Sequence, residues 1–247
     1  MSFGLAFLHG IGGSADTWQP QVAHFQGRFE VLAWNAPGHG GTPPLDKVSV
    51  ANLAGRLAED IDRAGLEKTV VVGHSFGGMV AQQFVRDYPG KVAGLVLSAT
   101  SAAFGSPDGD FQKQFVADRT RPLDEGKSMA QMASQVMPKL LGSNAGQAAI
   151  DIARNAMSTV PEQTYRATVA LLTTFDLRAD LANIAVPVLV IAGEQDRMTP
   201  PQMMERMALR IPGARFELMK DTGHLAPMEK PIEFNSLVES FVGEIHE

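Results

Sequence analysis

A serine between closely spaced glycines is the first feature of the sequence that could do chemistry. Residues 73–78 read Gly-His-Ser-Phe-Gly-Gly, and they follow the apolar, β-branched run 69–72. This G-x-S-x-G spacing suits a sharp turn from a strand into a helix, because side chains at the two glycines would block the turn. A serine held exposed in such a turn can act as a nucleophile. We therefore predict that Ser75 attacks substrate, with a glycine-rich turn and an incidental serine as the alternative.

A histidine and several carboxylates later in the chain could activate this serine. Asp196 comes shortly after a run typical of a buried parallel strand, and His224 follows a shorter strand pattern. The carboxyl ends of parallel strands meet at one edge of a sheet, where sites are built. We expect His224 to take the proton of Ser75 and Asp196 to hold the imidazole in the required tautomer. Two other acids stay open as alternatives to Asp196, namely Glu194 and Asp221.

Five segments together resemble the α/β-hydrolase superfamily: 7–14, 35–42, 73–78, 187–198 and 222–231. The likeness is greatest to its small bacterial ester-hydrolase branch, which includes carboxylesterases and enol-lactonases. It spans nearly the whole chain and is weakest between about 105 and 180. The order serine, acid, histidine is the order of that family. The motifs are specific for the fold and the triad, and they name no substrate.

The resemblance also implies where a developing negative charge would rest. In the family, the backbone N–H after the His-Gly pair and the N–H after the nucleophile form an oxyanion hole. Carried over to this sequence, these donors belong to Ile11 and Phe76. Fixed backbone donors stabilise a charge that exists only in the transition state. The helix that starts after Ser75 adds the positive end of its dipole.

The elements that must position these residues alternate between strand and helix. We predict an α/β-hydrolase fold with a mostly parallel sheet of about six strands, helices on both faces and a helical cap. The antiparallel hairpin that precedes the His-Gly loop in most of the family is missing here, which makes the exposed sheet edge a candidate homodimer interface. The strands are expected near 4–8, 29–34, 69–73, 92–98, 186–192 and 215–219, and the helices near 17–26, 49–64, 76–88, 200–210 and 231–245.

The gap between the strands that end near 98 and begin near 186 is too long for one crossover. We therefore assign 104–180 to a helical cap, and 1–103 with 181–247 to the hydrolase core. Helical patterns run over 111–116, 129–141, 145–157 and 161–175. The cap also contains five arginines, one of which an enol-lactonase would turn toward the nucleophile to clamp a carboxylated ring: Arg119, Arg121, Arg154, Arg166 and Arg178. The alternative for each arginine is a solvated surface position.

An apolar substrate pocket is expected beneath the cap. Methionine adapts to irregular surfaces, so the cap methionines are candidates for its wall. The alternative is that these side chains only pack the cap helices together. The predicted substrate-binding residues are Trp18, Met129, Met132, Met137 and Leu225.

Composition excludes several other classes of protein. The net charge of −6 and the lack of any Lys/Arg run argue against a nucleic-acid partner. No apolar stretch is long enough to span a membrane. The chain has no cysteine and no clustered metal-ligand pattern, so we expect neither a metal nor a cofactor. Residues 1–8 lack the positive start of a signal peptide and run into the His-Gly loop, so we expect a cytoplasmic protein.

These patterns predict a serine hydrolase that cleaves a small or medium carboxylic ester or lactone through an acyl-enzyme. An enzyme that resembles 3-oxoadipate enol-lactonase, and a carbon–carbon bond hydrolase of aromatic breakdown, are the alternatives. A cofactor-free perhydrolase and a non-catalytic ligand-binding protein with the same fold also stay open.

Overall fold

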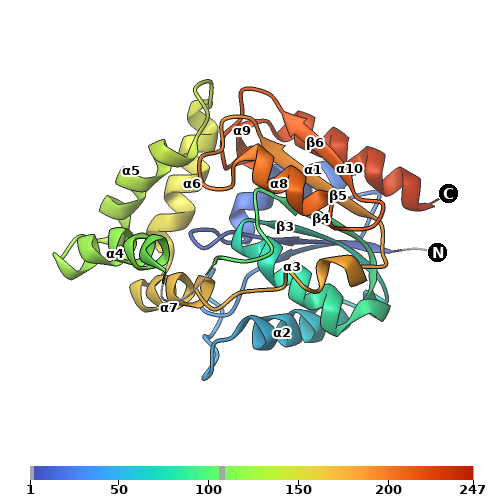
Figure 1. Cartoon of the computed structure of the whole chain (residues 1–247), viewed down its shortest axis with the longest axis horizontal. Helices are drawn as coiled ribbons and strands as arrows, with labels where there is room; N and C mark the ends of the chain where they lie inside the picture. The colour runs from blue at the N-terminus through green and yellow to red at the C-terminus, as the bar shows by residue number, and fades with distance from the viewer. Residues whose placement is uncertain (1–2, 106–108, 247) are drawn as a thin grey trace.

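A single sheet of parallel strands runs through the molecule (Figure 1). The structure is a computed structural model, and it describes residues 3–105 and 109–246. The sheet has six strands in the order β2-β1-β3-β4-β5-β6, and every neighbouring pair is parallel, as predicted. The strands are β1 Gly4–Leu8, β2 Val31–Trp34, β3 Thr69–His74, β4 Val92–Ser98, β5 Val188–Gly193 and β6 Arg215–Met219.

Alternate residues of the central strands point to opposite faces of the sheet. In β3, Val71 belongs to one buried apolar cluster, whereas Val70 and Val72 belong to the other. Side chains alternate in this way along any strand. Because helices cover both faces, the strand reads as a continuous run of valines rather than as an apolar and polar alternation.

Five helices form the two outer layers (Figure 1). One layer has α2 (Val50–Arg63), α3 (Phe76–Asp87) and α8 (Pro201–Ala208), which contribute to one cluster. The other layer has α1 (Gln19–Phe25) and α10 (Pro231–His246), which contribute to the second cluster. These helices lie where the sequence predicts them, with ends that differ by a few residues. Of the described helices, none combines the length and the apolar character that crossing a membrane requires.

Short helical turns complete these layers. They are η1 Ala15–Trp18, η2 Pro89–Lys91, η3 Leu181–Asn183 and α9 Ala226–Glu229. The sequence analysis did not predict α9, because four residues are too few to produce a helical periodicity. This turn follows directly on the loop that carries His224, so its position matters for the site.

Four helices are inserted between β4 and β5 (Figure 1). They are α4 (Asp110–Asp124), α5 (Met129–Leu140), α6 (Gln147–Thr159) and α7 (Glu162–Leu172). Ser128 starts α5 with a capping box, in which its side chain and that of Gln131 bond to each other's backbone N–H groups. Figure 1 shows the four helices gathered at one end of the sheet.

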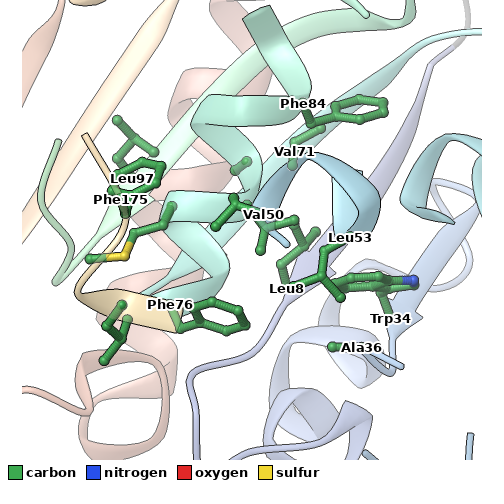
Figure 2. Close-up of a cluster of buried hydrophobic side chains, with 14 of the residues drawn as sticks. Leu8, Trp34, Ala36, Val50, Leu53, Val71, Phe76, Phe84, Leu97 and Phe175 are labelled. Atoms are coloured by element: carbon green, nitrogen blue, oxygen red, sulfur yellow. The ribbon is translucent and has the colours of Figure 1, made fainter. Parts of the chain in front are cut away.

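The insert and the sheet share one apolar cluster. Figure 2 draws part of it, including Leu8 of β1, Phe76 of α3 and Phe175 of the chain that returns from the insert. The two connections to the insert run side by side, because the Phe104 N–H donates to the Phe175 carbonyl at 3.1 Å. A continuous core of this kind fixes the insert over the sheet edge, since interiors pack densely and resist sliding. The division at 104 and 180 stays a prediction.

Candidate active site

The site lies where the order of strands reverses. The chain passes from β1 outward to β2 and returns through β3 on the other side of β1. The loops that leave the carboxyl ends of β1 and β3 therefore diverge, which opens a crevice at this point of an α/β sheet. The first loop carries Ile11 and the second carries Ser75.

Ser75 sits in a strained turn between β3 and α3. Its backbone has φ 53° and ψ −118°, a conformation that costs a non-glycine residue about 1–3 kcal/mol. The Ser75 N–H donates to the Ser98 carbonyl at 2.9 Å, which helps to hold the turn. A Cβ at Gly77 would lie 2.2 Å from the Leu8 carbonyl oxygen, so only glycine allows the turn to pack this closely against β1. This confinement aims the Ser75 hydroxyl away from the sheet.

Three side chains from separate loops form a hydrogen-bonded chain. The Ser75 Oγ lies 3.0 Å from Nε2 of His224, and Nδ1 of the same ring lies 2.8 Å from Oδ2 of Asp196. An ionised carboxylate can only accept, so the ring proton lies on Nδ1 and Nε2 is left as an acceptor. Nε2 can therefore take the Ser75 proton. The structure thus brings together the serine, histidine and acid that the sequence predicts.

Asp196 is held as an anion by donors around it. The N–H groups of Met198 and Thr199 donate to its Oδ1 at 2.7 and 3.1 Å, and the Thr199 hydroxyl donates to its Oδ2 at 2.5 Å. Burial alone would raise the pKa of Asp196, but its interaction with the His224 ring and these hydrogen bonds hold it below its ordinary value. The other two candidate acids are exposed: Glu194 accepts the Asp221 N–H at 2.9 Å, and neither contacts the His224 ring in the described chain.

Two backbone N–H groups in the loops around Ser75 have no acceptor in the described chain. Those of Ile11 and Phe76 donate to no oxygen of the residues that the structure describes. Phe76 is the first residue of α3, where N–H groups have no partner within the helix. The ring of Phe76 is buried in the core (Figure 2), so its N–H is fixed in direction. The geometry leaves both donors available to an anionic oxygen.

Two buried histidines hold the loops around the site. His74 Nε2 lies 2.8 Å from the His224 carbonyl, and His9 joins two loops through the Gly10 carbonyl at 2.7 Å and the Ala36 N–H at 3.1 Å. Burial lowers the pKa of both His9 and His74 to about 3. Both are therefore neutral at physiological pH, and each is held in one tautomer. His9 donates to a carbonyl and accepts from an N–H, whereas His74 donates to a single carbonyl.

A cavity of about 410 Å³ lies between the end of the sheet and the inserted helices. Ser75 and His224 line it, together with Ile11. Two of the predicted substrate-binding residues, Met137 and Leu225, are also in its wall. Most of the remaining wall is aliphatic and aromatic, as in small-molecule pockets generally.

The structure places the other three predicted pocket residues outside this cavity. Trp18 is 1% exposed and packs on Phe7, with ring centroids 5.1 Å apart. It belongs to the apolar cluster on the face of the sheet that α1 and α10 cover. Met129 and Met132 lie in the first turn of α5, whereas Met137 lies in the last. At 1.5 Å per residue, Met129 and Met137 are separated by roughly 12 Å along the helix axis. Helical periodicity identifies the buried face of α5, and it does not indicate which turn reaches the cavity.

Several residues at the site were not singled out from the sequence. Thr199 binds Asp196, and its spacing of three residues after an aspartate is the pattern of a local side-chain turn that could have indicated it. Glu229 binds the backbone on both sides of His224, and no sequence pattern that we considered points to it. Arg119 also lines the cavity, and the sequence did not distinguish it from the other four arginines of the cap. Tyr165 lines the cavity as well. No group of three or more His, Asp or Glu side chains in the described ranges is placed to hold a metal ion.

Comparison with known proteins gives the family context. Residues 5–231 match the family described as having the alpha/beta hydrolase fold. The dihydrolipoyllysine-residue acetyltransferase component of the acetoin cleaving system of Cupriavidus necator is 29% identical over 242 residues, and the match covers 96% of this chain but 63% of that protein. A 3-oxoadipate enol-lactonase 1 of Acinetobacter baylyi is 24% identical over 244 residues, with 98% and 89% of the two chains covered. A solved thermophilic esterase of Thermogutta terrifontis, bound to malate, superposes with a TM-score of 0.87 at 28% identity and covers 100% of this chain and 92% of its own.

Proposed function

This chain belongs to the alpha/beta hydrolase fold family, and we propose that it is a serine hydrolase that cleaves small or medium carboxylic esters or lactones. One observation carries the proposal. The Ser75 hydroxyl lies 3.0 Å from a histidine nitrogen whose other nitrogen is bound to a buried carboxylate, and the serine opens into an apolar cavity. This arrangement has the parts that acyl transfer needs: a nucleophile, a base, an orienting acid and a space for the acyl group.

Acylation begins when Ser75 Oγ attacks the substrate carbonyl carbon. A new C–O bond forms as Nε2 of His224 takes the hydroxyl proton, and Asp196 stabilises the imidazolium that results. The carbonyl oxygen becomes an oxyanion, which the Ile11 and Phe76 N–H groups bind. The C–O bond to the leaving group then breaks, and His224 returns the proton to the departing alcohol. For a lactone, that alcohol stays attached to the acyl group.

Deacylation repeats these steps with water. His224 takes a proton from a water molecule, the hydroxide attacks the acyl-enzyme carbonyl, and the bond to Ser75 Oγ breaks. The proton passes back to Ser75, so the enzyme is regenerated and a carboxylic acid leaves. Each oxyanion donor contributes about 2.7–4 kcal/mol of transition-state stabilisation in comparable sites.

The burial of the acid and base supports this mechanism. Asp196 is 4% exposed and His224 is 7% exposed, so water competes little for the bond between them. The lowered pKa of Asp196 keeps it ionised at neutral pH, and the ring therefore carries its proton on Nδ1. The esterase and enol-lactonase activities of the relatives belong to the same reaction class, which supports an ester or lactone as the substrate.

The proposal is tested with p-nitrophenyl esters from acetyl to decanoyl. We expect the wild type to turn over part of the series, and Ser75→Ala to lose at least about 10⁴-fold in kcat, because a triad without its nucleophile retains only background catalysis. The chain length with the highest kcat/KM measures the acyl space in the cavity.

The matched control is Ser236→Ala, which removes an exposed hydroxyl on α10 that, in the described chain, bonds only to the Ile232 carbonyl of its own helix. This variant should keep wild-type turnover and should still react with a fluorophosphonate probe, whereas Ser75→Ala should not react. Equal turnover in wild type and Ser75→Ala would refute the proposed function.

A further inference from the structure

The charged side chains in the cavity wall all have the same sign. Two arginines, Arg119 and Arg197, line it, and no Asp or Glu of the described residues does. This is unexpected in a chain whose net charge is −6. A cavity with basic groups and no acid favours an anionic occupant, because low-dielectric walls strengthen the field inside.

Arg119 of α4 is half-buried, and its guanidinium lies against an aromatic ring. Its guanidinium carbon lies 3.4 Å from the centroid of the Phe115 ring. Its nearest polar partners are distant: the Phe115 carbonyl at 3.5 Å and the sulfur of Met198 at 3.9 Å. No carboxylate in the described parts of the chain forms an ion pair with it. Burial lowers the pKa of Arg119, which is the expected effect on a cation that has lost its water.

The other arginines of the insert lie in different surroundings. Arg154 pairs with Asp151 at 2.7 Å, Arg166 pairs with Asp124 at 2.7 Å and with Glu162 at 2.8 Å, and Arg178 pairs with Asp176 at 2.5 Å. Arg121 is exposed on the surface. The fold therefore pairs or solvates these four cations, and it leaves the half-buried Arg119 without an ion pair in the described parts of the chain.

A second donor lies in the same part of the wall. Tyr165 of α7 is 1% exposed and lines the cavity, and its hydroxyl bonds to no other residue in the described part of the chain. The helices α4 and α7 pack against each other, which brings Tyr165 into the same part of the cavity wall as Arg119. Burial raises the pKa of Tyr165, and the hydroxyl therefore keeps its proton and can donate it.

A half-buried guanidinium without an ion-pair partner is unfavourable, and a carboxylate is the group that matches its planar donors. We propose that Arg119 and Tyr165 form a subsite for a carboxylate of the substrate, and that the enzyme acts on esters or lactones that carry a free carboxylate away from the reacting carbonyl. Half-esters of short dicarboxylic acids and carboxylated lactones are such compounds. The inference rests on the proposed function, since Ser75 in the same cavity would cleave the ester bond.

The test compares an anionic ester with a neutral one of matched length. The substrates are mono-p-nitrophenyl glutarate, adipate and pimelate, each against the p-nitrophenyl ester of the unbranched monocarboxylic acid with the same number of carbons. The measured quantity is the ratio of kcat/KM for the anionic ester to that for the neutral ester. We expect the wild-type ratio to exceed about 10 for at least one length, and the preferred length measures the distance from Ser75 to the subsite.

Substitutions then assign this preference to residues. Arg119→Gln should lower the ratio by about 10- to 100-fold, and Tyr165→Phe should lower it by about 3- to 10-fold. Arg119→Lys should retain part of the preference, because it keeps the charge and loses the planar fork. Arg121→Gln, which removes an exposed charge from the same helix, is the matched control and should leave the ratio unchanged.

The possible failures of the two proposals are distinguishable. A wild-type ratio near 1 at every length, or an equal ratio in Arg119→Gln and wild type, overturns the subsite while Ser75-dependent turnover of neutral esters still stands. A drop in Arg197→Gln instead of Arg119→Gln also overturns it. If no ester is turned over, calorimetry with Ser75→Ala and monomethyl glutarate, adipate and pimelate still decides: binding that Arg119→Gln abolishes supports the subsite, and no binding of any of them refutes it.

Discussion

Glu229 is expected to hold the histidine of the site in place, although it contacts none of the reacting atoms. Its Oε2 accepts the N–H groups of Gly142 and Gly223 at 2.8 and 3.0 Å, and its Oε1 accepts the N–H of Leu225 at 3.0 Å. Gly223 and Leu225 flank His224, and Gly142 belongs to the loop after α5. One carboxylate thus ties the histidine loop to the inserted helices.

The size of the effect of Glu229→Gln follows from these three bonds. Glutamine keeps one side-chain oxygen, which can still accept the N–H groups that one of the two carboxylate oxygens accepted. Its NH₂ group takes the place of the other oxygen and then faces a backbone N–H, which it cannot accept. At least one charge-assisted bond is lost, which costs about 1.5–3 kcal/mol. For a chain of this length, about 2 kcal/mol corresponds to a Tm lower by about 4–8 °C. Because a misplacement of about 1 Å at a catalytic group can cost 10²-fold, we expect kcat to fall by about 10- to 100-fold.

The assay measures Tm by calorimetry and kcat and KM on the best p-nitrophenyl ester. Glu233→Gln is the matched control, because it removes an exposed carboxylate of α10 whose ion pair with Lys230 spans 3.7 Å. A positioning role predicts a loss mainly in kcat at a temperature where both variants are folded. If Glu229→Gln and Glu233→Gln have the same Tm and the same kcat, the carboxylate does not hold the loop and the reasoning fails.

Three further predictions concern the acid, the turn and the buried histidines. Asp196→Asn should lower kcat by about 10³- to 10⁴-fold with an unchanged circular dichroism spectrum, because the amide favours the tautomer with its proton on the wrong nitrogen; a loss smaller than tenfold would contradict this role. Gly77→Ala should destabilise the fold by more than about 3 kcal/mol in urea, since its Cβ would meet the Leu8 carbonyl at 2.2 Å, whereas Gly90→Ala, with nothing within 4 Å, should be neutral. The pKa values of His9 and His74 are lowered to about 3, so the unfolded chain binds more protons between that pH and about 6.5, and stability falls as the pH falls through this window. The two together should remove about 4 kcal/mol between pH 7 and pH 5, and urea midpoints that do not change over this range would refute their neutral burial.

The juxtaposition of Ser75, His224 and Asp196 could be predicted from the sequence because local backbone chemistry positions each of them. Ser75 needs a strand, two glycines and a helix, all within a few residues. Asp196 and His224 each follow the end of a strand, and parallel strands bring their carboxyl ends to one edge without further information. The structure adds what such patterns do not contain, such as the bond from the Glu229 carboxylate to both sides of His224.

The helix α4 was predicted over only part of its length because charged residues interrupt its periodicity, whereas the patterns over 129–141, 145–157 and 161–175 correspond to α5, α6 and α7. The apolar pattern indicates a helix only over 111–116, whereas α4 extends from Asp110 to Asp124. Its second half contains Asp118, Arg119 and Arg121, and it has Pro122 in its last turn, where the lost N–H bond disturbs little of the helix. Arg119 therefore lies in the part of α4 that the pattern missed. A side chain that serves a ligand departs from the core pattern by its nature, so periodicity is a poor guide to it.

The contact between α5 and the histidine loop helps to determine which residues of α5 reach the cavity. The His224 N–H donates to the Leu140 carbonyl at 2.7 Å, so the last residue of α5 is bound to the loop of the site. This bond places the final turn of α5, with Val136, Met137 and Leu140, against the cavity, and it directs the first turn away from it. Residues on the buried face of α5 therefore line the cavity when they lie close to the bond between Leu140 and His224, and they pack in the core when they lie far from it. A sequence-based search for specificity residues in such an insert must therefore locate this anchor first and count turns from it, because the helical pattern is the same on either side.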